Sequence, residues 1–295
     1  VYAVGIWWVA EPNPTLENWR PVVIRIDATG KEMWKQIDAK GGKLEPVVVM
    51  PGGDVLALGY TQFQPPSRPM AWRLNKGGTE VERIFLGSTS TRGRLYGAAV
   101  EADGGVVTVG RHGDEGPASD GLIARYGGKG DFKTIEAFGQ SSVDDALRAV
   151  ALDDHGLRFA VGQRATSPNT PWLALQKAGE SALEASVLAP NKGGHAGLQA
   201  VARASKTVMV AGGSAGTTGV DDVWWLAGID TSGKRLWSRE GPTINGGGAS
   251  DTITDCVALP DGSVACTGLQ TEVGKVGSHD VLVLRVDAAG KSGCQ

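Results

Sequence analysis

Histidines and carboxylates are the residues of this chain whose types could support acid–base chemistry or metal binding. Three of the four histidines lie between apolar runs, in the same set of expected loops as several acidic residues. This group comprises His112, Asp114, His195, Asp222 and His279. No two histidines have the His-x-x-x-His or His-Glu-x-x-His spacing that places metal ligands together. We therefore predict no metal or other cofactor, assign no catalytic residue, and treat the group as candidate binding residues.

Tryptophans form a second group of candidate binding residues. Trp7, Trp8 and Trp19 flank a segment with two prolines, where indole rings could stack on sugars or fill a pocket of a partner. Successive residues of a strand point to opposite faces, so one of Trp7 and Trp8 is expected in the core. The same reasoning places one of Trp224 and Trp225 between sheets.

Two of the three cysteines flank a Pro-Asp-Gly turn. Cys256 and Cys266 then face each other across a hairpin, where Cα separations of about 4.5 to 5.5 Å permit a disulfide. We predict this disulfide, with two buried thiols as the alternative. Cys294 has no further cysteine within residues 1–295 with which to pair, so it is free, bonded to a cysteine outside these residues, or bonded to another subunit.

Glycines recur with a period of about fifty residues, each near the end of a short apolar run. The series is Gly5, Gly59, Gly110, Gly162, Gly212 and Gly268. A second series, in turn-like sequences further along each repeat, is Gly30, Gly78, Gly130, Gly179, Gly233 and Gly290. This regularity predicts an array of one supersecondary unit.

Each repeat contains apolar runs separated by Gly, Pro or Asp turns, which is typical of an antiparallel meander. We name its four expected strands A to D in chain order. The B strands are expected at residues 1–7, 53–60, 105–111, 157–163, 206–213 and 263–269. Sheets that are apolar on both faces must stack on neighbours. The sequence therefore predicts an all-β fold, a single six-bladed β-propeller of four-stranded antiparallel blades over residues 1–295.

Closure of the ring requires strands from both termini. We expect residues 279–294 and Val1–Gly5 to share the last blade, with its innermost strand upstream of Val1. An open or three-stranded last blade is the alternative. Residues 181–189 occupy the place of an outer strand, and we predict strand there rather than helix.

The A–B and C–D turns of such a meander lie at one end, and the longer B–C and D–A connections lie at the other. Loops on a rigid scaffold often carry function, so this long-loop end is the expected binding face. Asp120, Asp222 and Asp280 at the starts of C strands are expected to bind turn amides.

Residues 139–166, 246–271 and 280–291 resemble the SBBP-type bacterial propeller repeat in their Gly, Asp and apolar positions. This resemblance implies an extracytoplasmic binding or scaffold role and no catalytic residues. Residues 25–34 and 228–237 also resemble the repeat of quinone-dependent dehydrogenases, with Trp34 and Trp237 at its terminal tryptophan. That family uses eight blades and adjacent cysteines, and this chain has no adjacent cysteines.

A formal net charge of −3 and no long basic run argue against a nucleic-acid partner, and no apolar run is long enough to span a membrane. The first hypothesis is a non-catalytic extracytoplasmic module that binds a protein or glycan, in possible assembly with another chain that donates a strand. A glycan-binding lectin is one alternative. A carbohydrate-active hydrolase or lyase is another, and it requires two of His112, His195, His279, Asp145 and Asp251 to converge.

Overall fold

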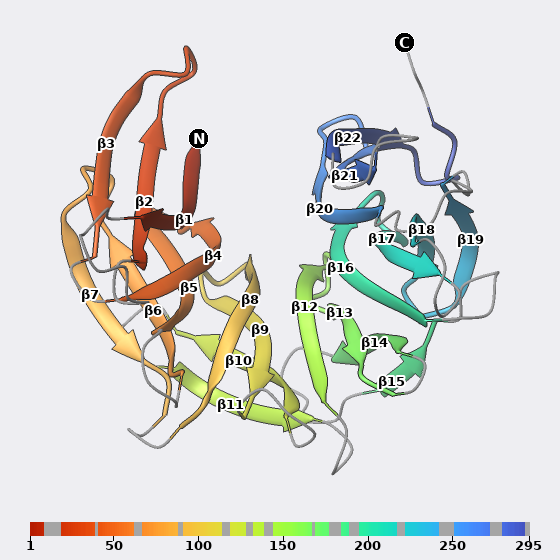
Figure 1. Ribbon diagram of the computed structural model, residues 1–295, viewed down its shortest axis with the longest axis horizontal. Helices are drawn as coiled ribbons and strands as arrows, with labels where there is room; N and C mark the ends of the chain where they lie inside the picture. Colours follow the sequence, from red (N-terminus) through yellow and green to blue (C-terminus); the bar gives the residue numbers. More distant parts are fainter. Residues whose placement is uncertain are drawn as a thin grey trace. The chain divides into compact units, whose positions relative to one another are not determined.

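All the regular secondary structure described by the computed structural model is β-strand (Figure 1). The described residues are 1–8, 19–38, 41–61, 67–87, 91–113, 119–127, 132–138, 144–166, 169–176, 184–188, 195–216, 222–241, 251–271 and 279–292. They form six antiparallel sheets of three or four strands. The chain divides into two compact units, Val1–Asp144 and Asp145–Gln295. The all-β prediction is thus confirmed, and the single six-bladed ring stays a prediction.

Unit 1 contains three sheets, drawn in red to yellow-green in Figure 1. The first sheet has β1 (Tyr2–Trp8), β2 (Trp19–Ile26) and β3 (Glu32–Ile37). The second sheet has β4 (Gly42–Val49), β5 (Val55–Thr61), β6 (Pro69–Leu74) and β7 (Glu80–Phe85). The third sheet has β8 (Gly93–Val100), β9 (Val106–His112), β10 (Asp120–Tyr126) and β11 (Phe132–Phe138).

Unit 2 contains the other three sheets, drawn in green to blue. The fourth sheet has β12 (Asp145–Leu152), β13 (Arg158–Arg164), β14 (Thr170–Gln176) and β15 (Glu184–Val187). The fifth has β16 (His195–Arg203), β17 (Val208–Gly216), β18 (Val223–Asp230) and β19 (Arg235–Glu240). The sixth has β20 (Thr252–Ala258), β21 (Val264–Thr271) and β22 (His279–Val286). β15 confirms the strand expected within residues 181–189.

Every sheet is a meander in which sequence neighbours pair, so its strands correspond to the expected strands A to D. The first sheet contains B, C and D, and the sixth contains A, B and C. Among the described residues, β1 pairs with β2 and β22 pairs with β21. The expected sharing of the last blade by Val1–Gly5 and residues 279–294 is therefore not confirmed and stays a prediction.

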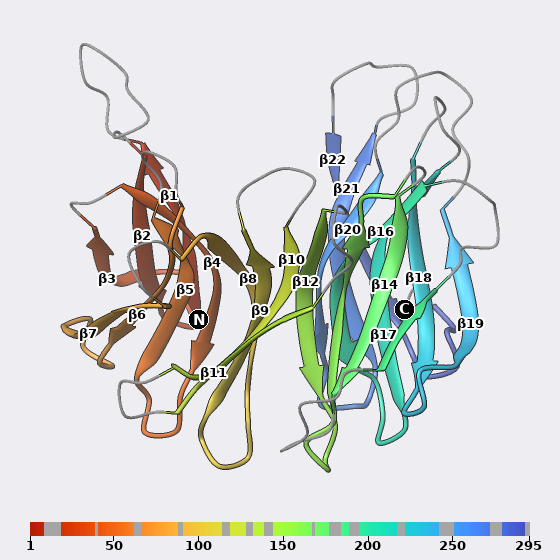
Figure 2. The same cartoon turned by 90° about the horizontal axis from the view of Figure 1, so that it is seen from below.

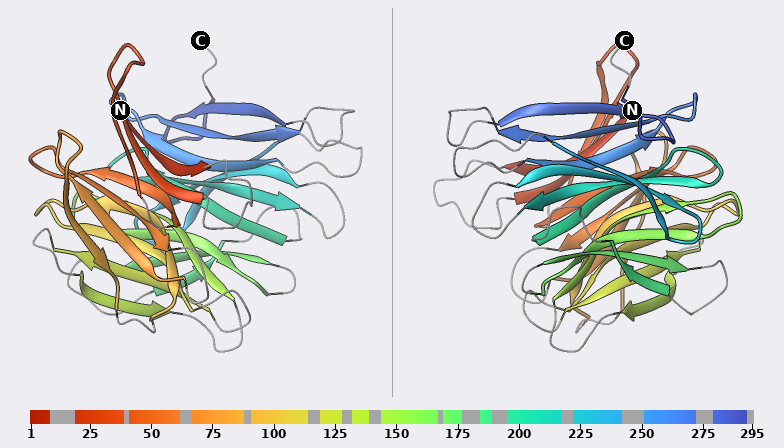
Figure 3. Two further views of the ribbon diagram at one scale, coloured as in Figure 1. Left: turned by 60° about the vertical axis from the view of Figure 1, so that its left-hand side comes forward. Right: turned by 90° about the vertical axis from the view of Figure 1, so that its right-hand side faces the viewer.

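Apolar side chains of adjacent sheets form the cores. In unit 1, Leu56 and Leu58 of the second sheet pack with Leu95 and Leu122 of the third. In unit 2, one core includes Leu173 and Trp225, which lie on the fourth and fifth sheets. Figures 2 and 3 show the strands of unit 2 layered sheet on sheet, in green to blue. Trp225 is fully buried while Trp224 is half-buried, which confirms that one member of this pair is a core residue.

A bulge in strand A explains the first glycine series apart from Gly5, which faces no strand A among the described residues. In the third sheet, Tyr96 is an extra residue between the pairs Leu95↔Gly110 and Gly97↔Val109. A Cβ added at Gly110 would lie only 1.9 Å from the backbone oxygen of Arg94. The same clash, at 1.9 to 2.0 Å, arises at four other glycines that face a strand A bulge, namely Gly59, Gly162, Gly213 and Gly268. Only glycine fits opposite the bulge.

The fifth repeat is shifted by one residue from the expected glycine alignment. Leu198 pairs with Gly213, just as Leu95 pairs with Gly110, whereas Gly212 pairs with Ala200. Because this repeat has two consecutive glycines, the sequence alone did not show which of them faces the bulge. Gly213 therefore replaces Gly212 in the series.

Hydrogen-bonded turns explain the four described glycines of the second series, while Gly130 and Gly179 lie outside the described residues. The Asp27 carboxylate accepts bonds from the Thr29 and Lys31 amides at 2.8 and 3.0 Å. Gly30 then adopts a φ of 86°, which glycine tolerates better than other residues. Asn75, Asp230 and Asp287 accept equivalent bonds in later repeats. These local bonds close the C–D turns.

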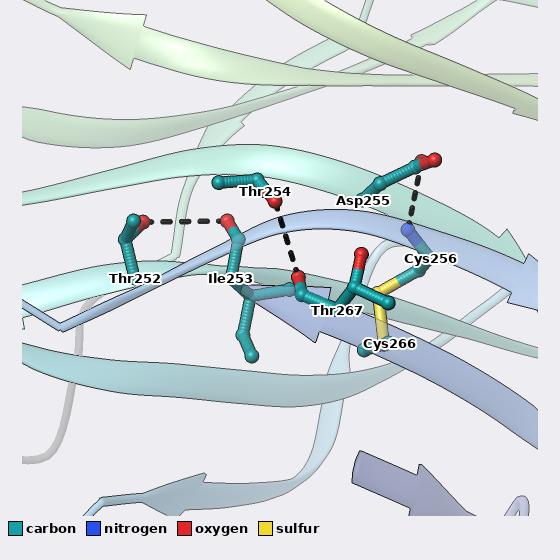
Figure 4. The surroundings of a disulfide bond; sticks show 7 residues. All are labelled: Thr252, Ile253, Thr254, Asp255, Cys256, Cys266 and Thr267. Atoms are coloured by element: carbon teal, nitrogen blue, oxygen red, sulfur yellow. Dashed lines mark hydrogen bonds between the residues drawn. A yellow bond between two sulfur atoms is a disulfide. The ribbon is translucent and has the colours of Figure 1, made fainter. Parts of the chain in front are cut away.

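The predicted disulfide between Cys256 and Cys266 is present, and it links β20 to β21 with a Cα–Cα distance of 4.1 Å (Figure 4). Figure 4 also shows Asp255 accepting a hydrogen bond from the Cys256 amide at 2.8 Å. The Thr254 hydroxyl donates to the Thr267 carbonyl at 3.3 Å. Cys294 lies outside the described residues.

Reduction of the disulfide is expected to lower the free energy of unfolding by about 2 kcal/mol, because the bond closes a short loop. The sequence separation of the two cysteines is only 10. Thermal unfolding with and without a reductant measures this loss. A double variant with Cys256→Ser and Cys266→Ser serves as the control, since its melting temperature should not respond to the reductant.

Candidate binding site

The histidines and acids selected from the sequence lie at strand ends or outside the described residues. His112 ends β9 and is half-buried, while Asp114 lies outside the described residues. His195 begins β16 and His279 begins β22, at positions where only the backbone is described. Asp222 is half-buried, and its carbonyl accepts a bond from the Asp251 amide at 3.1 Å. Their convergence stays a prediction, as do the turn contacts expected of Asp120, Asp222 and Asp280.

For the tryptophans near the N-terminus, the structure describes the position of the backbone. Trp8 and Trp19 are direct partners across β1 and β2, and Trp7 is the partner of Arg20. Trp7 and Trp8, as successive residues of one strand, belong to opposite faces of the first sheet. Their role in binding stays a prediction.

Two carboxylates considered for acid–base chemistry are fully buried. Asp145 lies 3.5 Å from the Nε atom of Arg164. Asp251 accepts a bond from the Thr271 amide at 2.7 Å. Both contacts connect neighbouring strands of one sheet, and so they support a structural role for these two groups.

A cationic and aromatic group that the sequence analysis did not select lies in unit 1. It comprises Lys43 and Glu45 of β4, Tyr60 of β5, and Arg94 and Tyr96 of β8. We call these five residues the Lys43–Tyr96 cluster. They lie at the starts of two A strands and the end of a B strand, where the B–C and D–A connections attach. The cluster is therefore at the long-loop end expected to carry function.

Strand bulges contribute two residues of the cluster. Tyr96 is the extra residue of β8, and Glu45 belongs to the bulge of β4. A bulge re-aims side chains at a sheet edge, and strand A is the edge strand of both sheets. Lys43 and Arg94 occupy equivalent places directly before the bulge-flanking leucines of their strands.

Direct contacts hold the cluster together. The guanidinium carbon of Arg94 lies 4.4 Å from the centre of the Tyr60 ring, a cation–π contact between the third and second sheets. The Lys43 amine lies 2.8 Å from the Glu45 carboxylate. Tyr96 makes a small electrostatic contribution to the raised pKa values of Lys43 and Tyr60.

Burial and charge fix the protonation states of two members of the cluster. Burial raises the pKa of the Tyr60 phenol, although the positive charges of Arg94 and Lys43 oppose that shift. Burial alone would lower the pKa of Lys43, but its hydrogen bond and ion pair with Glu45 prevail and raise that pKa. At neutral pH, Tyr60 therefore stays protonated and Lys43 stays cationic.

The other A strands carry different polar residues at the bulge. In unit 2 the extra residues are Arg148, Gln199 and Thr254. The bulge is thus repeated in each of these A strands, while the side chain of the extra residue differs from sheet to sheet. Among the described residues, no three His, Cys, Asp or Glu side chains gather closely enough to hold a metal ion.

No family model matches the chain, and no curated protein sequence matches it. Solved structures do match it. A protein of unknown function from Bacteroides caccae is 14% identical, with a TM-score of 0.57, covering 99% of this chain and 91% of that one. A polysaccharide lyase described as a PL25 ulvan lyase is 11% identical, with a TM-score of 0.59, covering 92% and 70%.

A third solved structure similar to this chain is a catalytically inactive virginiamycin B lyase from Staphylococcus aureus with quinupristin. It is 11% identical, with a TM-score of 0.51, covering 96% of this chain and 88% of that one. At such low identity these likenesses show the fold alone. Together with the repeated antiparallel meanders, they define an all-β, propeller-like protein.

The sequence held one signal for the Lys43–Tyr96 cluster. Tyr60 directly follows Gly59 of the repeating series, and the residue in that place differs between repeats. Variation at a fixed place in a repeat indicates a residue that the fold does not require. The partners of Tyr60 lie on another strand and another sheet, so the signal alone did not predict the cluster.

Proposed function

We propose that this protein is an extracytoplasmic, non-catalytic module that binds an acidic glycan at the Lys43–Tyr96 cluster. The observation that carries this proposal is the stacking of Arg94 on Tyr60 beside Lys43 and Tyr96, at the long-loop end of unit 1. The proposal selects the glycan from the two partner classes, protein and glycan, that the sequence left open.

The chemistry of the cluster fits a sugar that carries a carboxylate or sulfate. A guanidinium donates two parallel hydrogen bonds to such a group, and an ammonium adds a point charge. The half-buried Tyr96 offers a ring face for the C–H groups of a pyranose and a hydroxyl at the ring edge, whereas Tyr60 is only 5% exposed and packs against the Arg94 guanidinium. Lys43 and Glu45 retain 37% and 23% exposure of their side chains, so solvent reaches the ion pair.

One of the similar structures supports the choice of an acidic sugar. The PL25 ulvan lyase is also described bound to -[GlcA(1-4)Rha3S]-, and that structure has a TM-score of 0.59 to this chain. A microbial sialidase, Hadza Hz136, with a TM-score of 0.53, is a further neighbour of this fold. These names support carbohydrate as the ligand class without assigning a residue.

The protonation states in the cluster favour binding over turnover. A tyrosine whose pKa is raised stays protonated at neutral pH and is a poor general base. The nearby carboxylate of Glu45 is engaged by the Lys43 amine. A polysaccharide lyase remains the second candidate because two of the similar structures are described as lyases.

The disulfide supports an extracytoplasmic location, since such bonds persist in oxidising compartments. The resemblance to SBBP-type repeats also implies an extracytoplasmic location. None of the described residues forms a helix with the length and hydropathy needed to span a bilayer.

Calorimetric titration with oligosaccharides tests the proposal. We expect uronate-containing or sulfated oligosaccharides to bind and neutral glucans not to bind, with an affinity that falls as salt screens the charges. Arg94→Ala should weaken binding by about tenfold or more, because a charge-assisted hydrogen bond is lost. Lys234→Ala, at an exposed C–D turn of unit 2, is the matched control and should leave affinity unchanged.

Two results would count against this function. Equal affinity of the wild type and Arg94→Ala would remove the cluster as the binding site. Release of new sugar ends during incubation with an acidic polysaccharide would show turnover and favour the lyase alternative.

A further inference from the structure

The Glu45 carboxylate is the feature of the Lys43–Tyr96 cluster from which we draw a further inference, and that inference rests on the proposed binding of an acidic glycan. Glu45 is the acidic member of a cluster that also contains two cations and two tyrosines. Like charges repel, so this carboxylate opposes the approach of an anionic group. Glu45 therefore limits which acidic sugars the cluster can accept.

The position of Glu45 is fixed by the bulge of β4. Glu45 and Pro46 lie in the bulge directly after Leu44, which is buried. The ring of Pro46 restricts the backbone that follows Glu45. The Lys43 amine lies 2.8 Å from the Glu45 carboxylate. The backbone and the ion pair thus hold this carboxylate within the cluster, where 23% of the Glu45 side chain is exposed to a ligand.

The charges of the cluster are arranged around the Tyr60 ring. Lys43 is the direct partner of Tyr60 across β4 and β5, and the Arg94 guanidinium lies 4.4 Å from the ring centre. Burial is the main cause of the raised pKa of the Tyr60 phenol, while the charges of Arg94 and Lys43 oppose that shift and the charge of Glu45 adds to it. Because these three charges act on one phenol group, a single sugar that lies on the cluster is close to all of them.

The two sides of the cluster suit different groups of a sugar. The Arg94 guanidinium can donate parallel hydrogen bonds to a carboxylate or sulfate. The Glu45 carboxylate only accepts hydrogen bonds, so it suits a sugar hydroxyl, which donates one. The charges of Lys43 and Glu45 offset each other, so their side of the cluster attracts a second anion weakly. An acidic group placed there would meet a like charge, and a repulsive contact of this kind excludes the wrong ligand.

We propose that Glu45 makes the Lys43–Tyr96 cluster selective for sugars that carry one acidic group per ring. The acidic group binds Arg94, and a hydroxyl of the same ring donates a hydrogen bond to Glu45. Lys43 holds the Glu45 carboxylate in the position that accepts this bond. A second acidic group on the same ring is directed at Glu45 and weakens binding. The ligand class is therefore a glycan of unsulfated uronates or singly sulfated sugars, and glycans of sulfated uronates are excluded.

A matched pair of ligands tests this selectivity. The first ligand is an unsulfated tetrasaccharide of alternating glucuronate and N-acetylgalactosamine. The second ligand is the same tetrasaccharide with a sulfate on each glucuronate ring. Calorimetric titration of the whole chain at constant ionic strength should show that the unsulfated ligand binds about tenfold more tightly or better, because it places no second anion against Glu45.

Glu45→Gln is the variant that tests the role of the charge. Glutamine keeps an oxygen that accepts a hydrogen bond and removes the negative charge. We expect the affinity for the sulfated ligand to rise by about tenfold, because the repulsion is lost. The affinity for the unsulfated ligand should fall by about threefold, because a charge-assisted hydrogen bond becomes a neutral one. Glu32→Gln makes the same change at an exposed residue at the start of β3 and should leave both affinities unchanged.

Three results would overturn this role of Glu45 and leave the glycan site in place. They are equal binding of the two ligands by the wild type, an unchanged preference in Glu45→Gln, and an equal gain for both ligands, which would reflect net charge alone. Binding of neither tetrasaccharide by the wild type would overturn the proposed function as well. If Glu45→Gln does not fold, the comparison of the two ligands on the wild type decides by itself.

Discussion

Gly110→Ala is expected to lower the free energy of unfolding by about 3 kcal/mol, because overpacking against a fixed backbone cannot be relieved by a rotamer change. The added Cβ would lie 1.9 Å from the Arg94 oxygen and 3.0 Å from the Leu95 Cα. Relief requires β8 and β9 to separate at the bulge. Urea unfolding, followed by circular dichroism, measures this loss.

Gly5→Ala is the internal control for that prediction. It makes the same chemical change at the equivalent place of another sheet, where no atom of the described residues lies within 4 Å of the added Cβ. We expect its stability to stay within about 1 kcal/mol of the wild type, or to rise slightly through reduced entropy of the unfolded chain. Equal losses at Gly5 and Gly110 would show that strand propensity, rather than the bulge, requires glycine.

Trp225→Ala is expected to cost about 4 kcal/mol, the range for removing a large buried side chain and leaving a cavity. Trp225 is fully buried in the core that includes Phe159 and Leu173. Its indole N–H donates a hydrogen bond of 2.7 Å to the Ser238 hydroxyl, which the alanine variant also loses. The unfolding midpoint in guanidinium chloride measures the change.

Trp224→Ala provides the comparison, since the two residues are adjacent in β18. Trp224 is only half-buried and packs against a different core. Its removal should cost about half as much, because less apolar area returns to water. A larger loss at Trp224 than at Trp225 would contradict the assignment of Trp225 as the main anchor of the fifth sheet.

The repeated bulge combines a fixed backbone contact with a side chain that differs between sheets. The glycine opposite each bulge is fixed by a backbone contact, while the extra residue varies among Tyr96, Arg148, Gln199 and Thr254. Changes of the extra residue leave the ladder intact. The bulge therefore allows different copies of the repeat to carry aromatic, cationic or neutral polar side chains at equivalent positions of an edge strand.

The features that the sequence predicted correctly depend on contacts local to one hairpin or turn. Glycine spacing predicted the strands, because a bulge or a turn acts on residues within one meander. The Pro-Asp-Gly turn predicted the pairing of Cys256 with Cys266 for the same reason. The Asp27 turn likewise closes on residues two and four places further along the chain.

Tertiary structure decided the features that depend on packing between strands and sheets. The repeats did not reveal that Gly213 rather than Gly212 faces a bulge, because both residues satisfy the local pattern. They did not predict that Arg94 stacks on Tyr60, since that contact needs two sheets packed face to face. Periodicity describes one repeat of the chain, whereas the Lys43–Tyr96 cluster depends on which sheets pack against each other.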